Sequence, residues 1–322
     1  MFRFILSAIL VLIVSPTTVT AQQGSTKATG SSGASASRDS MSGETTSSKP
    51  VSSSHDMTEE KHGGFWMFPE PAPLEGYIAT DRPGFSDSAS LVPRGHTHLE
   101  GGYTFSYDRE QHHRAIDHQL PELALRTGLM EWLEFRLNWT GYSFTETLDR
   151  VATIAGRHVG REDHDDGARD MSVGFKLPLL KHRDDCVPNV SIIPTLYLPT
   201  GSDSKSANNV VPEIKFPWNY PINECFTVYG SVLGRVPDGP DGQFFQTAVT
   251  LAGNYKFSDC VSVFLEYLGV YPSTRSEDCA HSISGGPIFK LTQNVSLDMR
   301  AGLGLNEQAP DFQASIGFGI RF

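Results

Sequence analysis

The sequence predicts an all-β protein, a single antiparallel β-barrel of about twelve strands that crosses the outer membrane of a bacterium. Three observations predict it: an export signal at the N-terminus, alternation of apolar and polar residues from His96 onward, and the lack of an apolar run after residue 14 long enough for a transmembrane helix. The mean hydropathy of -0.26 suits barrel strands, which are apolar on one face only. The formal net charge of -11 argues against a nucleic-acid partner, whose phosphates this surface would repel.

The N-terminus has the pattern of a secretory signal peptide. Arg3 precedes the apolar residues 4–14, and the small residues of Val19-Thr20-Ala21 offer a cleavage site, so we expect cleavage after Ala21. The following stretch is rich in Ser, Thr and Gly and cannot bury enough apolar surface to fold. The sequence therefore divides into a signal peptide (1–21), a disordered tether (22–63), a pre-barrel segment (64–95) and an outer-membrane barrel (96–322).

The barrel strands are predicted from a period of two. Between Phe312 and Phe322 every second residue is apolar and the residues between are polar or Gly, and the same pattern recurs at 295–305, 99–108 and 133–140. Extending this pattern along the chain predicts strands near 96–108, 118–127, 132–144, 168–177, 188–199, 207–217, 225–235, 243–254, 260–270, 279–290, 294–304 and 311–322.

The predicted connections alternate in length. Short turns follow the even-numbered strands, whereas longer connections, including the charged stretch 145–167 and the Gly/Pro/Asp-rich stretch 236–242, follow odd-numbered ones. Bacterial outer-membrane barrels have short periplasmic turns and longer external loops, so we expect 145–167 to be an external loop.

An acidic residue followed by Cys recurs at Cys186, Cys225 and Cys260, each at the predicted start of an odd-numbered strand, and Cys279 falls at the opposite rim. Alternate strands lie roughly 9 to 10 Å apart, which exceeds disulfide reach unless the turns lean together. The sequence is compatible with two alternatives, free thiols or one disulfide bridge.

The faces opposite the apolar stripes carry equal numbers of acids and bases. Unpaired ions in a dry soluble core would each cost several kcal/mol, so these side chains indicate a wet or internally paired lumen, either a solute path or a salt-bridge network that supports the barrel. Their balance argues against strong ion selectivity. The predicted lumen-lining residues are Glu100, Asp108, Glu122, Arg126, Glu134, Arg136, Asp170, Lys176, Glu213, Lys215, Arg235, Glu266, Lys290, Asp298, Arg300 and Arg321.

Two motifs carry a resemblance to a known family. Thr80-Asp81-Arg82-Pro83, followed by Val92-Pro93-Arg94-Gly95-His96, and Leu198-Pro199-Thr200-Gly201 at the end of the fifth predicted strand are similar to those of the outer-membrane transporters named for the meta-pathway of phenol degradation. The resemblance covers roughly residues 78–322 and implies an outer-membrane barrel of the porin or transporter type. It also implies that the terminal Phe322 is recognised by the barrel-assembly machinery. The tether and the Cys repeat are not part of the family pattern.

The pre-barrel segment has two interpretations. Pro83, Pro93 and Gly95 bend or stiffen it, and Asp81 with Arg82 could pair with lumen charges, so that 64–95 forms a partial plug. The alternative is a periplasmic strap.

No enzyme motif accompanies these features. His112, His113, His118, His158 and His164 lie in or beside predicted external loops near Asp163, Asp165 and Asp166, without a nucleophile elbow, a zinc-binding helix or a phosphate loop. We therefore expect a transporter or porin-like channel for small solutes, hydrophobic or aromatic ones among them, in contact with outer-membrane lipid and needing no catalysis, cofactor or metal. The alternatives are a closed structural or interaction barrel and, as a third, an outer-membrane hydrolase using His164 or Asp166.

Overall fold

The computed structural model describes residues 71–322 except 75, 111–112, 155–156, 183–186, 240–241 and 275–277, and gives no side chains for 150–159. The predicted signal peptide (1–21), the predicted tether (22–63), residues 64–70, His112 and Cys186 therefore lie outside the described residues. Within them, no helix is long and apolar enough to cross a membrane.

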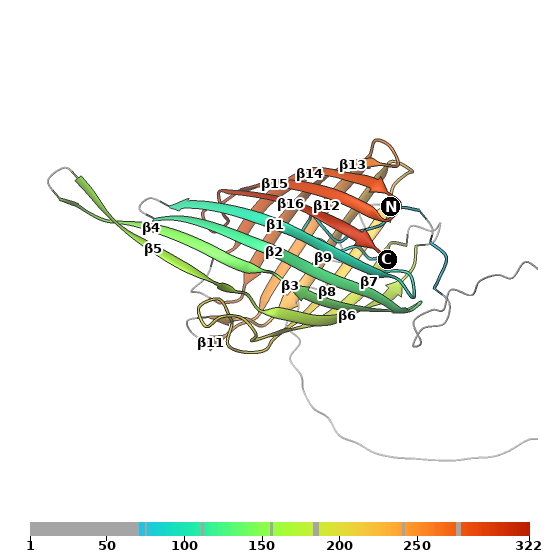
Figure 1. The fold of residues 1–322 in the computed structure, drawn as a ribbon, viewed down its shortest axis with the longest axis horizontal. Helices are drawn as coiled ribbons and strands as arrows, with labels where there is room; N and C mark the ends of the chain where they lie inside the picture. Colours follow the sequence, from blue (N-terminus) through green and yellow to red (C-terminus); the bar gives the residue numbers. More distant parts are fainter. Residues whose placement is uncertain are drawn as a thin grey trace, which may run out of the picture. The chain divides into compact units, whose positions relative to one another are not determined.

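The chain forms a closed antiparallel ring of strands, because β1 pairs on one side with β2 and on the other with β16 (Figure 1). Consecutive strands are neighbours almost throughout, as hairpin connections dictate. The strands are β1 Thr97–Glu110, β2 His113–Met130, β3 Leu133–Trp139, β4 Tyr142–Ile154, β5 Arg157–Ala168, β6 Met171–Leu180, β7 Asn189–Leu198, β8 Val211–Pro221, β9 Phe226–Arg235, β12 Gln246–Lys256, β13 Val261–Pro272, β14 Ala280–Thr292, β15 Val295–Gly304 and β16 Phe312–Arg321, with β10 Asp238–Gly239 and β11 Gly242–Gln243 forming a separate small hairpin.

Two strands of the ring are interrupted. Both β3 and β4 pair with β2, and the break between them lies at Thr140 and Gly141, where Gly141 has a φ of 91° that a glycine adopts without strain. A second break at Arg169 and Asp170 separates β5 from β6. When each broken strand is counted once, the ring has twelve strands, which confirms the predicted fold class.

The predicted external loop at 145–167 was wrong. These residues form most of β4 and β5, which pair from Tyr142↔Ala168 to Ile154↔Arg157 and extend well beyond the other strands (Figure 1). Charged and polar residues occupy both faces of this stretch, so alternation could not reveal it. Its backbone groups are nevertheless satisfied by the ladder.

Histidines expected in or beside loops are also in strands. His113 and His118 belong to β2, and His158 and His164 belong to β5. Smaller differences concern strand ends: β8 runs to Pro221 and β12 to Lys256, beyond the predicted 217 and 254. Polar strand ends carry no periodic signal that would fix their limits.

Burial along the strands is inverted relative to a soluble protein. In β15, Ser296, Asp298 and Arg300 are buried, whereas Leu297, Met299 and Leu303 are 40%, 46% and 55% exposed. Apolar side chains therefore cover the outside of the ring and polar side chains fill its inside, as in a transmembrane barrel.

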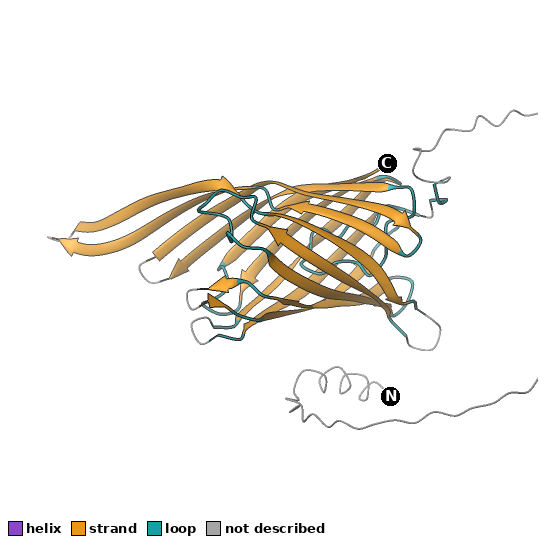
Figure 2. Ribbon diagram, turned by 90° about the horizontal axis from the view of Figure 1, so that it is seen from below, coloured by secondary structure: helices purple, strands orange, loops and turns teal. Residues whose placement is uncertain are grey.

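We call the end of the ring that holds the start of β1 and the end of β16 the near rim, and the end from which the β4–β5 hairpin projects the far rim (Figures 1 and 2). Cys225 and Cys260 precede strands that start at the near rim and Cys279 lies at the far rim; all three are exposed free thiols.

Candidate functional site

A segment of the chain before β1 passes through the interior of the ring; we call residues 79–92 the inner segment. It is fastened at the near rim on both sides. Before it, the Ile78 amide donates to the Gln293 carbonyl at 2.9 Å; after it, Arg94 forms a parallel bridge with Gly128 and the Gly95 amide donates to the Gly128 carbonyl at 2.8 Å. The inner segment is thus a loop whose two ends meet the same rim.

Its local sequence prevents it from joining the sheet. Pro83 and Pro93 have no amide hydrogen to give to a ladder, and Gly95 has a φ of 81°, which ends the extended path just before β1. The backbone amides of the inner segment are consequently free to meet side chains of the wall instead.

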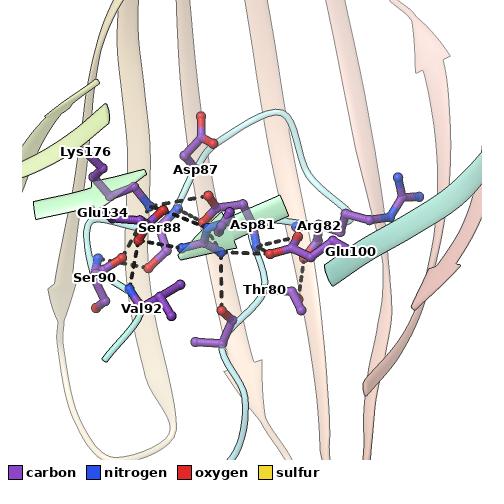
Figure 3. Close-up of polar contacts among 12 residues, drawn as sticks. Thr80, Asp81, Arg82, Asp87, Ser88, Ser90, Val92, Glu100, Glu134 and Lys176 are labelled. Atoms are coloured by element: carbon purple, nitrogen blue, oxygen red, sulfur yellow. Dashed lines mark hydrogen bonds and ion pairs between the residues drawn. The ribbon is translucent and has the colours of Figure 1, made fainter. Parts of the chain in front are cut away.

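Asp81 lies at the centre of a cluster of cations, of which Lys176 is labelled in Figure 3. Its Oδ2 is 2.6 Å from Nη1 of Arg136 and 3.3 Å from Nζ of Lys176, and its Oδ1 is 3.3 Å from Nη1 of Arg126. Oδ1 also accepts a hydrogen bond from the Ser88 amide at 2.8 Å, which closes the inner segment into a compact loop. One carboxylate of the segment therefore holds three wall cations from β2, β3 and β6.

These charges keep Asp81 ionised. Burial alone would raise the pKa of its carboxyl group, but the positive charges of Arg126, Lys176 and Arg136 hold that pKa well below its ordinary value of 3.8. The negative charge of Asp81 is therefore part of the folded state at every physiological pH.

Two wall glutamates bind the same segment through its backbone. Glu100 accepts the amides of Asp81 and Arg82 at 3.0 and 3.1 Å, and Glu134 accepts the Val92 amide at 2.8 Å. Arg126 joins the two carboxylates, with Nη1 2.8 Å from Glu100 and Nε 2.9 Å from Glu134. This arrangement satisfies buried carboxylates with amides and a guanidinium, which is what buried charges require.

The far side of the inner segment reaches β8 and β13. Asp87 lies 2.7 Å from Nη2 of Arg136 and 2.5 Å from Nζ of Lys215. Glu266 accepts the amides of Phe85 and Ser86 at 2.7 and 2.8 Å and the Ser86 hydroxyl at 2.6 Å. The segment therefore spans the interior from β1 to β13.

Arg82 is held between two acids of the wall. Its Nη1 is 2.7 Å from Glu122, and its Nε is 3.5 Å from the fully buried Asp298. Gly102 and Gly317 make room for the guanidinium, because a Cβ at either position would overlap Arg82 atoms. The glycines of β1 and β16 thus leave the space that this side chain occupies.

The remaining predicted lumen residues have other surroundings. Arg321 is buried and donates to the carbonyls of Gly76 and Gln293, and Arg235 donates to Gln246. Lys290 lies 5.6 Å from the Tyr77 ring centre. Glu213 and Arg300 are buried inside the ring, and Asp108 is half-buried.

The second motif forms a separate site at the far-rim end of the ring. Asp170, in the break between β5 and β6, accepts the amides of Gly201 and Ala207 at 2.9 Å each, and the Thr200 hydroxyl accepts the Met171 amide. Asp170 therefore fixes the connection that follows Pro199 and does not meet the inner segment. Of the first motif, Thr80, Asp81 and Arg82 lie inside the ring, Pro83 is buried, and Pro93 and Gly95 form the return to the near rim.

Sequence reasoning missed the role of three residues of the inner segment: Ser86, Asp87 and the Ala89 carbonyl, which accepts the Ser191 hydroxyl at 2.6 Å. The one signal in the sequence was the charge of Asp87, which follows Asp81 and Arg82 after four uncharged residues.

Among the described side chains, no histidine candidate lies within hydrogen-bond distance of a serine, threonine or cysteine, and Nδ1 of His118 lies 2.7 Å from the Tyr103 hydroxyl. His113 contacts Asp149 at 2.6 Å, His164 lies 3.8 Å from Glu162, and the Tyr142 hydroxyl donates to Asp166. No group of His, Cys, Asp and Glu with metal-binding geometry occurs in the described part of the chain.

A family model described as "Putative MetA-pathway of phenol degradation" matches residues 80–322. The chain belongs to this family. Its match begins at Thr80, so it includes the inner segment as well as the barrel. A comparison with curated proteins gives no match.

Solved structures share the fold. An outer membrane channel from Pseudomonas putida F1 aligns with 14% identity and a TM-score of 0.55, covering 74% of this chain and 99% of that one. The NanC porin aligns with 9% identity and a TM-score of 0.42 over 70% of this chain and 98% of that one, and the CymD monoaromatic hydrocarbon channel with 8% and 0.37 over 70% and 88%. The alignment with the Pseudomonas putida channel, whose TM-score exceeds 0.5, shows that the protein has the fold of an outer-membrane β-barrel.

Proposed function

We propose that the protein is an outer-membrane channel for small solutes, exported with cleavage after Ala21, whose lumen is closed by the inner segment acting as a plug. The observation that carries this proposal is the set of buried contacts between Asp81, Arg82 and Asp87 and the wall, which crosses the interior from β1 to β13. Because the inner segment is fastened at one rim only, its contacts with the wall can break together while the ring of strands stays intact.

The family description supports aromatic compounds as the first solutes to test. Lipid is the proposed partner of the exposed apolar faces. The barrel-assembly machinery is the proposed partner of the Phe322 ring, which is 62% exposed.

A second candidate is a permanently closed structural barrel, which the density of buried ion pairs around Asp81 favours. Catalysis is not part of the proposal, because the His164 and Asp166 side chains contact Glu162 and Tyr142 and not a serine, threonine or cysteine.

Planar-bilayer recording separates the candidates. Residues 79–92 are replaced by a short Gly/Ser linker in the otherwise full chain, and folding is checked by heat-modifiable gel mobility. We expect long-lived large current steps from this variant and small or rare steps from the native chain. A folded variant that stays silent would favour the structural barrel, and native-size currents in both would exclude the plug.

A further inference from the structure

Arg300 is a charged residue of the interior that takes no part in the ion pairs between the wall and the inner segment. It faces inward from β15, is 8% exposed, and makes no hydrogen bond or ion pair with any described residue. Its Nε is buried without a partner. Guanidinium groups carry five donors and are almost never buried unpaired, and Arg126 and Arg136 follow that rule here.

Among the described residues, Arg300 makes a cation–π contact with an aromatic ring of the inner segment. Its guanidinium carbon lies 4.1 Å from the centre of the Phe85 ring, a cation–π geometry that fixes one face of the group and satisfies none of its N–H donors. Across the ladder lies Ser315, whose hydroxyl also lacks a partner. The Arg300 guanidinium and the Ser315 hydroxyl are thus hydrogen-bond donors without an acceptor among the described residues.

Two of the acids around Arg300 are already engaged: Glu122 pairs with Arg82, and Glu266 accepts three hydrogen bonds from Phe85 and Ser86. The third acid, Asp298, lies 3.5 Å from Nε of Arg82, and neither of its oxygens accepts a hydrogen bond from a described residue. All three act on Arg300 electrostatically, yet none is within ion-pair distance. Because three carboxylates surround two guanidiniums, an incoming anion would meet net negative charge in a poorly screened interior. A neutral acceptor oxygen avoids this repulsion.

The side chains beside Arg300 are partly exposed inside the ring. The side chains of Arg82 and Glu122 are 17% and 20% exposed, in contrast to the fully buried Lys176 and Glu134 nearer the Asp81 cluster. Farther along β1 and β16, Ser106, Asp108 and Gln313 are half-buried.

We propose that Arg300, beside Phe85 and Arg82, binds an uncharged small solute through an acceptor oxygen such as a carbonyl or hydroxyl. This inference rests on the proposed channel function and names the class of solute that the lumen binds. Arg300 supplies the hydrogen bonds, and the acids around it select against carboxylate analogues of the same shape.

The test compares three probes of similar shape on the full chain in detergent, by calorimetry or ligand-observed NMR. Benzamide has a neutral acceptor oxygen, benzoate is its anionic analogue, and toluene has no acceptor. We expect benzamide to bind at least tenfold more tightly than either of the others. Tighter binding of benzoate would make the site an anion site, and equal binding of toluene would make it an apolar one; either result overturns the proposal.

Substitutions then locate the binding. Arg300→Met is expected to weaken benzamide binding at least tenfold, with Arg300→Lys intermediate and Arg114→Met, an exposed arginine on β2, unchanged. If Arg300→Met does not fold, Phe85→Leu replaces it, because the loss of the ring frees the guanidinium and should weaken binding several-fold. Unaltered binding in a folded variant would contradict the assignment. These binding measurements need no membrane. A failure of the channel proposal in the bilayer recordings can therefore be told apart from a failure of the binding proposal.

Discussion

Replacing Asp81 by Asn should open the channel and destabilise the barrel together. The substitution leaves Arg126, Arg136 and Lys176 without their shared carboxylate, and removing one partner of a buried ion pair typically costs about 3–5 kcal/mol. We expect the free energy of unfolding in guanidinium to fall by about that amount, and bilayer recordings to show frequent large openings.

Asp259→Asn is the matched control. Asp259 forms one ion pair with Lys256 at the near rim and its side chain is 75% exposed, so its loss should change neither stability nor current measurably. If Asp81→Asn behaved like this control, the cation cluster would not hold the inner segment.

Gly128→Ala should displace the return of the inner segment to the rim. A Cβ at Gly128 would overlap the carbonyl oxygens of Val92 and Pro93, which are backbone atoms that cannot rotate away. Overpacking of this kind costs about 1–3 kcal/mol. We expect a lower temperature for the heat-induced mobility shift, and a conductance intermediate between the native chain and the linker variant.

The comparison for this prediction is Gly253→Ala, where the nearest atoms belong to the Phe226 side chain at 3.1 Å. That ring can shift slightly, so stability and conductance should stay close to native. Equal effects of the two substitutions would mean that the Val92–Pro93 contact has no special role.

The alternation of apolar and polar residues was enough to predict the ring of strands. Because side chains in a strand point to opposite faces in turn, the pattern around Glu134 and Arg136, and again around Asp298 and Arg300, also predicted which side chains turn inward, and the structure buries all four. The β4–β5 hairpin escaped prediction because charged residues there cover both faces.

The pairing inside the ring could not be predicted in the same way. Which acid meets which base depends on the path of an irregular segment that has no period, so Asp87 was not connected with Arg136 and Lys215. The sixteen charged residues predicted to line the lumen could not be told apart in the sequence. In the structure Arg126 is fully paired and Arg300 is not. The need for glycine at positions 102 and 317 becomes apparent only in the structure, where the Arg82 guanidinium packs against Gly102 and Gly317.

The position of the inner segment can be measured directly with a designed disulfide. The Ser86 hydroxyl lies 2.5 Å from the Thr250 hydroxyl of β12, so cysteines at both positions, in a chain whose four native cysteines are changed to serine, should be within bonding distance. We predict that mild oxidation links them, detectable as a joined peptide by mass spectrometry, and that the link suppresses large openings until a reductant is added. Failure of the two thiols to join in the folded barrel, with currents unchanged by oxidation, would contradict the account.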